Sequence, residues 1–168
     1  MTKNLELATW VEDIAALTKP ERIHWCNGSE EERQNLTDVM LESGDLIRLN
    51  EATHPNCYLH RSDPNDVARV EHLTYVCTPE REDAGPNNNW MAPKKAHAKV
   101  NALFDSCMRG RTMYIVPYLM GPYGSPFARG GVEITDSAYV VLNMRIMARI
   151  GQRALEHIDA GGFKMLVD

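Results

Sequence analysis

The sequence predicts a single α/β domain of mixed α+β type, in which a mixed sheet is flanked by helices. The chain has 168 residues, 43% of them hydrophobic, which is enough for one sizeable core but not for two. Some segments repeat apolar residues at helical spacing, whereas others carry short apolar or β-branched runs. The two kinds alternate without a regular βαβ order, so residues 1–168 are expected to form a mixed sandwich rather than a doubly wound sheet.

Two helices are predicted at the start of the chain. Apolar residues recur at helical spacing over 7–17, until Pro20 ends the pattern. After a short apolar stretch, Ser29 and Glu32 form a capping box, and Gly44 supplies a C-terminal stop. These signals predict a second helix between the box and the glycine.

Residues 45–78 carry short apolar or β-branched runs that are separated by proline and asparagine. This pattern predicts strands at 46–49, 57–59 and 73–76. The next segment, 79–92, is rich in proline, glycine, asparagine and charge, which predicts a loop exposed to solvent. Too little chain lies on either side for this loop to be a domain boundary.

A third helix is predicted from Pro93, which suits a first helical turn, through Cys107 to a stop at Gly110. Residues 112–116 then form a strand candidate. Because proline cannot donate to a sheet ladder, Pro117 is expected to end this strand or to place it at an edge.

The last part of the chain is expected to alternate again. In order, it contains a stiff turn at 121–126, a strand at 131–135, one long helix through Leu155 and an apolar run at 163–167 that reads as a strand. Asp136 or Ser137 is expected to cap the long helix.

The composition argues against several functions. A formal charge of −5 and a pI near 5.7 do not suit an extended nucleic-acid surface, which needs clustered basic residues. No stretch reaches the roughly 20 apolar residues of a membrane-spanning helix, and the N-terminus lacks the apolar run of a secretory signal. We therefore expect a soluble, cytoplasmic protein that binds neither nucleic acid nor membrane.

Four cysteines are widely separated and form no CxxC pair: Cys26, Cys57, Cys77 and Cys107. Three of them lie near a histidine, in His24-x-Cys26, in His54-x-x-Cys57 and in His72 with Cys77. Zinc accepts both ligand types, but these spacings match no standard zinc framework. Reduced, metal-free thiols are predicted, with a zinc-binding structural domain as the alternative.

Strong motifs of nucleotide and metal chemistry are absent from the sequence, which contains no GxxxxGK[ST], GxGxxG or HExxH. Arg69 and Glu71 stand out instead, because they lie two apart in a predicted extended segment and would share one face. A guanidinium there could bind a small dianion, with the carboxylate holding it while the site is empty. The same spacing also suits an ordinary surface ion pair, which on spacing alone is the commoner case.

Six ordered strings resemble one known family. They are 63–71 (DPNDVARVE), 79–84 (PEREDA), 108–114 (MRGRTMY), 116–126 (VPYLMGPYGSP), 133–141 (EITDSAYVV) and 144–151 (MRIMARIG). Each is similar, in the same order and at comparable spacing, to a segment of GTP-dependent phosphoenolpyruvate carboxykinase. The resemblance covers essentially the whole chain and is to the GTP-using rather than the ATP-using branch. It implies the fold of that enzyme's N-terminal, substrate-side domain.

Members of that family are gluconeogenic lyases that convert oxaloacetate and GTP to phosphoenolpyruvate, GDP and CO2 with manganese and magnesium. The resemblance implies that Arg69 binds the anionic end of oxaloacetate or phosphoenolpyruvate. It also implies that Glu71 positions Arg69 and helps to couple substrate binding to closure of a lid. The family's phosphate loop, metal ligands, catalytic cysteine and guanine pocket would lie beyond residue 168, so no catalytic or metal-binding residue is assigned.

These inferences predict a folded but inactive polypeptide that binds neither GTP nor a metal ion by itself. Its partner would be the missing C-terminal nucleotide-binding domain, and apolar surface left uncovered is expected to favour a homodimer. The asparagine-rich loop at 79–92 suggests a bacterial rather than an animal member. A stand-alone module that binds anions without catalysis is a further alternative.

Overall fold

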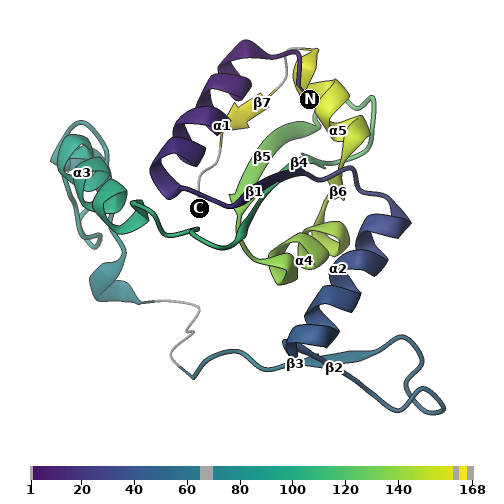
Figure 1. Ribbon diagram of the computed structural model, residues 1–168. Coiled ribbons are helices and arrows are strands. Elements are labelled where there is room, and N and C mark those ends of the chain that lie inside the picture. Colours follow the sequence, from purple (N-terminus) through teal and green to yellow (C-terminus); the bar gives the residue numbers. More distant parts are fainter. Residues whose placement is uncertain (1, 65–69, 161–162, 166–168) are drawn as a thin grey trace.

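A computed structural model describes residues 2–64, 70–160 and 163–165 (Figure 1). A mixed sheet lies between two pairs of helices, so the predicted α/β class is confirmed. The long central strand, β4 (Thr112–Met120), has neighbours on both sides, and the strand order is β1-β4-β5-β7 with β6 also paired to β4. The shorter strands are β1 (Arg22–Trp25), β5 (Arg129–Thr135), β6 (Arg149–Ile150) and β7 (Phe163–Met165).

Parallel and antiparallel pairs both occur in this sheet. β1 runs parallel to β4 and β7 runs parallel to β5, whereas β4 pairs antiparallel with β5 and with β6. The predicted strands within 131–135 and 163–167 are therefore confirmed in β5 and β7. The turn-rich connection at 121–126 joins β4 to β5, as its proline and glycine content predicts.

The helices cover the two faces of the sheet in pairs: α1 (Leu5–Thr18) with α5 (Gln152–Asp159), and α2 (Glu30–Ser43) with α4 (Ala138–Met147) (Figure 1). Successive residues of β4 point to opposite faces. Ile115 is buried against α1 and α5, whereas Val116 is buried against α2 and α4. Within the described parts of the chain, no helix combines the length and apolarity needed to cross a bilayer.

The first two predicted helices are confirmed, and a side-chain cap begins each of them. The side chain of Asn4 accepts from the amide of Leu7 at the start of α1. Ser29 does the same for the amide of Glu32 at the start of α2, and Gly44 ends that helix in the left-handed region.

A small antiparallel hairpin, β2 (Leu46–Arg48) with β3 (Tyr58–His60), confirms the strands predicted at 46–49 and 57–59. Segment 79–92 is mostly exposed, as predicted, and contains one short 3-10 turn, η2 (Arg81–Ala84).

The strand predicted at 73–76 is wrong. This segment begins in a 3-10 turn, η1 (Glu71–Leu73), and its only described pairing is a single bridge between Val76 and Trp90. Leu73 is 61% exposed. A strand is stabilised by a neighbouring ladder and a covered face, and these residues have neither.

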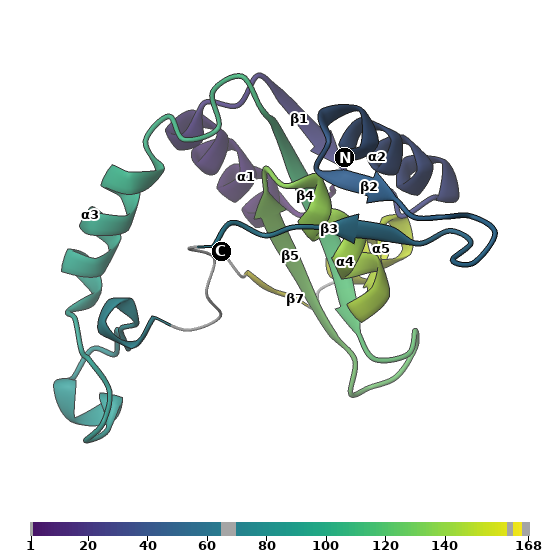
Figure 2. The ribbon, with the colours of Figure 1, turned by 90° about the horizontal axis from the view of Figure 1, so that it is seen from below.

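The third helix, α3 (Pro93–Phe104), begins as predicted but ends before Cys107. The chain leaves the helix because the amide of Ser106 donates to the carbonyl oxygen of Leu17, at the end of α1, over 2.8 Å. No residue of α3 is buried, and the helix stands away from the sheet in both views (Figures 1 and 2).

The expectation that Pro117 ends its strand is also wrong, because β4 continues through it in the middle of the sheet. The carbonyl groups of Ile115 and Pro117 point to the same side, where they accept from the amides of Cys26 (2.8 Å) and Gly151 (2.9 Å). β1 has ended at this level and β6 pairs only further along. Pro117 therefore faces a gap in the ladder, and its missing N–H costs no bond.

The single long helix predicted through Leu155 is two helices, α4 and α5, which are separated by β6. Ser137 caps α4, as predicted. The helix ends because residues 149–150 pair with the centre of the sheet and Gly151 adopts a φ of +97°. The pairing with β4 overrides the helical spacing of the apolar residues.

Candidate functional site

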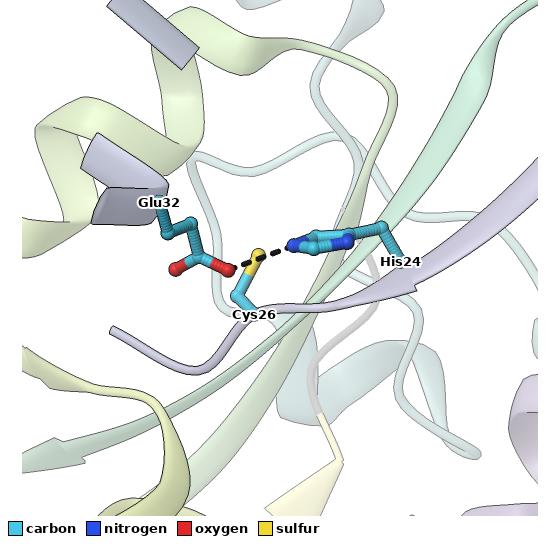
Figure 3. A group of neighbouring side chains, drawn as sticks. All are labelled: His24, Cys26 and Glu32. Carbon is cyan, nitrogen blue, oxygen red and sulfur yellow. Dashed lines mark hydrogen bonds and ion pairs between the residues drawn. The ribbon is translucent and has the colours of Figure 1, made fainter. Parts of the chain in front are cut away.

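Three side chains that can bind metals or exchange protons meet at the turn between β1 and α2: His24, Cys26 and Glu32 (Figure 3). His24 and Cys26 lie two apart on an extended segment and therefore face the same side. Trp25, between them, packs against the opposite core with α1 and α5. Glu32 reaches the same place from the first turn of α2.

The carboxylate of Glu32 is buried and accepts three hydrogen bonds. Its donors are the amides of Asn27 and Gly28, each at 2.9 Å, and Nε2 of His24 at 2.7 Å. In a standard capping box the carboxylate would bind the amide of Ser29, but that amide donates to the side chain of Asn27 instead. Glu32 therefore fixes both the turn and the orientation of His24.

Cys26 is 3% exposed, and its sulfur lies beside the hydrogen bond between His24 and Glu32 (Figure 3). Burial raises the pKa of the Cys26 thiol well above its usual range, and the negative charge of Glu32 raises it further. Since the thiolate is the reactive form, Cys26 is a poor nucleophile in this state. The other thiols are also free, and Cys57 and Cys77 are exposed.

This difference in exposure leads to a labelling prediction. At neutral pH, iodoacetamide is expected to modify Cys57 and Cys77 in the folded chain and to modify Cys26 only after denaturation. Peptide mass spectrometry over a time course measures the rate at each site. Modification of Cys26 as fast as that of Cys57 would contradict the buried, protonated thiol.

A pocket of about 480 Å³ adjoins this cluster and is lined by residues of β1, α2 and β4, including His24, Glu32, Leu36 and Tyr114. The imidazole of His24 meets the ring of Tyr114 edge-on, with 5.9 Å between ring centroids. The His24 side chain is 45% exposed, whereas that of Glu32 is 4% exposed. Of the three side chains in the cluster, His24 is therefore the one in contact with solvent.

Of the two predicted substrate residues, Arg69 lies outside the described residues. Glu71 is exposed and belongs to η1, so the expectation that it lies in an extended segment is wrong. Its backbone is held in place, because the side-chain amide of Asn89 donates to the carbonyl oxygens of Glu71 (2.8 Å) and Thr74 (3.2 Å). The indole of Trp90 donates to the carbonyl oxygen of Thr78 at 2.9 Å and fastens the same loop.

A polar pocket of about 910 Å³ lies beside Glu71 and is lined by residues 70–72, Thr74 and residues 87–89. Sequence reasoning treated the asparagine run only as loop composition and missed its role in shaping this pocket. The sequence did contain a signal for this role. Three consecutive asparagines precede Trp90, and asparagine side chains can hydrogen-bond to backbone groups.

Residues 9–167 match the profile of the family described as phosphoenolpyruvate carboxykinase N-terminal domain. Proteins named phosphoenolpyruvate carboxykinase [GTP] are similar to this chain. The Anaeromyxobacter dehalogenans protein is 57% identical over 157 residues, and those of Neocallimastix frontalis and Chlamydia muridarum are 50% identical over 159 and 156 residues. These alignments cover 93–95% of this chain and 26% of each relative. The chain thus spans about a quarter of the length of the curated relatives it matches.

Proposed function

Because the chain belongs to the phosphoenolpyruvate carboxykinase N-terminal domain family, we propose that it forms the substrate-side part of a GTP-dependent phosphoenolpyruvate carboxykinase. The complete enzyme would be a cytoplasmic, gluconeogenic lyase that converts oxaloacetate and GTP to phosphoenolpyruvate, GDP and CO2. The observation that carries this proposal is the continuous similarity, up to 57% identity, over 94% of the chain.

Within this function, we assign Arg69 to the anionic end of oxaloacetate or phosphoenolpyruvate. A guanidinium matches carboxylate and phosphate oxygens with two parallel hydrogen bonds. Glu71 would orient that guanidinium through its carboxylate. The hydrogen bonds from Asn89 support this role, because they hold the backbone at Glu71 while leaving its side chain exposed.

GTP and a divalent metal would be bound by the rest of the enzyme. Manganese and magnesium favour carboxylate, carbonyl and water oxygens. Among the described residues, the one group of three close metal-ligating side chains offers a nitrogen, a sulfur and a single carboxylate. This set does not fit those hard ions, and no step of the reaction is assigned to it.

The partner of this chain would be the C-terminal nucleotide-binding domain. Several large apolar side chains are strongly exposed and suit such a contact: Leu5, Leu103, Phe127, Ile146 and Met147. In the absence of that domain, a homodimer is expected to cover some of these side chains. Light scattering that detects only monomer at high concentration would exclude the homodimer.

A chimera tests the proposed function. The purified 168-residue chain is expected to form no phosphoenolpyruvate from oxaloacetate and GTP. Replacing the matched quarter of the Anaeromyxobacter dehalogenans relative with this chain should give an active enzyme, because the substrate-side groups would be restored. A coupled assay for phosphoenolpyruvate measures both proteins. GTP-dependent turnover by the chain alone, or a folded chimera without activity, would contradict the proposal.

A further inference from the structure

The cluster at the β1–α2 turn has the donor atoms and the spacing of a small metal site. One ligand atom from each of His24, Cys26 and Glu32 lies within 4.8 Å of the other two. We propose that these three side chains bind one thiophilic divalent cation of the zinc type, with a water from the adjoining pocket as fourth ligand. This function goes beyond the proposed carboxykinase role and does not depend on it.

The required rearrangement is on the order of 1 Å, because ligand atoms that now lie within 4.8 Å of one another must reach the spacing of a bound ion. Zinc bonds of about 2.0–2.3 Å at tetrahedral angles place ligand atoms about 3.3–3.6 Å apart. Nε2 of His24 and Oε1 of Glu32, now 2.7 Å apart, would separate by less than about 1 Å to admit the ion. The sulfur of Cys26 already points toward the bond that the ion would replace (Figure 3).

The surroundings hold the ligands in place before a metal arrives. The amides of Asn27 and Gly28 hold the carboxylate of Glu32, and they can keep these bonds when the other lone pairs bind a cation. The ring of Tyr114 supports His24 from the side. Outer contacts of this kind are typical of metal sites, where they orient the ligands.

The donor set and its charge favour zinc or cobalt over magnesium and calcium. Imidazole and thiolate are ligands of borderline and soft metals, and only one donor is an oxygen. On binding, the thiol of Cys26 loses its proton to solvent and the Nε2 proton of a neutral His24 moves to Nδ1. One proton is released per ion, and the cation neutralises the two negative charges of the thiolate and the carboxylate.

Cobalt(II) is the direct probe, because a cobalt–thiolate bond absorbs in the near ultraviolet. Titration of the reduced, metal-free 168-residue chain is expected to give this band with one cobalt per chain and release of about one proton per ion. Zinc should abolish the band by displacement, whereas magnesium should not. Absence of the band in the folded chain, or displacement by magnesium, would overturn the proposal.

Matched variants then locate the site. Cys26→Ala should remove the band, and His24→Gln, at a partly exposed position, should weaken binding by more than the 10- to 100-fold loss that outer partners cause. Cys57→Ser is the control, because Cys57 is exposed and belongs to the other short His–Cys spacing, His54-x-x-Cys57. It should bind cobalt as the parent chain does. A band that persists in Cys26→Ala or disappears in Cys57→Ser would refute the assignment.

Discussion

In the active chimera, Arg69→Lys is expected to lower kcat/KM for oxaloacetate about 30- to 900-fold, which corresponds to about 2–4 kcal/mol. Lysine keeps the positive charge but loses the planar fork that donates two parallel hydrogen bonds to an anion. The loss therefore reports geometry rather than charge. Steady-state kinetics with varied oxaloacetate measures it, and thermal unfolding checks that the fold is unchanged.

Two further variants test whether the loss is specific to the proposed substrate site. Glu71→Gln should lower kcat/KM in the same direction but more mildly, because in the proposed site Glu71 would act only through Arg69. Arg61→Lys is the matched control, since Arg61 is another exposed arginine of the same connection and should leave the kinetics unchanged. If Arg69→Lys preserves the kinetics and lowers the melting temperature instead, the pair is structural and the substrate-site assignment is wrong.

Gly151→Ala is expected to destabilise the folded chain by more than about 3 kcal/mol. Gly151 has a φ of +97° and a ψ of −152°, a region that is essentially restricted to glycine. A Cβ added there would overlap the backbone carbonyl of Asn27, which cannot move aside easily because it accepts a hydrogen bond from the amide of Gln152. Urea unfolding followed by circular dichroism measures the loss.

Gly44→Ala provides the control for backbone strain alone. Gly44 also has a positive φ, +82°, but a Cβ there would meet no atom within 4 Å. This variant should cost only about 1–2 kcal/mol. Equal losses for the two variants would contradict the predicted cost of overlap between a Cβ at position 151 and the carbonyl of Asn27.

The candidate sites were only partly predictable. The resemblance to a known family pointed to Arg69 and Glu71. The extended conformation expected for Glu71 is wrong. Its short-range sequence pattern could not show this, because the hydrogen bond that holds its backbone comes from Asn89, in a distant part of the loop. The His24-x-Cys26 spacing was visible in the sequence. Its third member was not, since Glu32 carried a capping signal, and only the turn between β1 and α2 brings its carboxylate beside the histidine.

The sequence by itself determined the features that depend on neighbours along the chain. The start of α2 and the cap at Ser137 follow from side chains that bind backbone groups a few residues away, whereas the end of α2 and the turn at 121–126 follow from glycine and proline. The tertiary structure alone decided where Pro117 could lie in a central strand, and where the helix after Ser137 had to break. Both depend on which strands pair with β4 and where each one ends, because ladder bonds and burial join residues far apart in sequence.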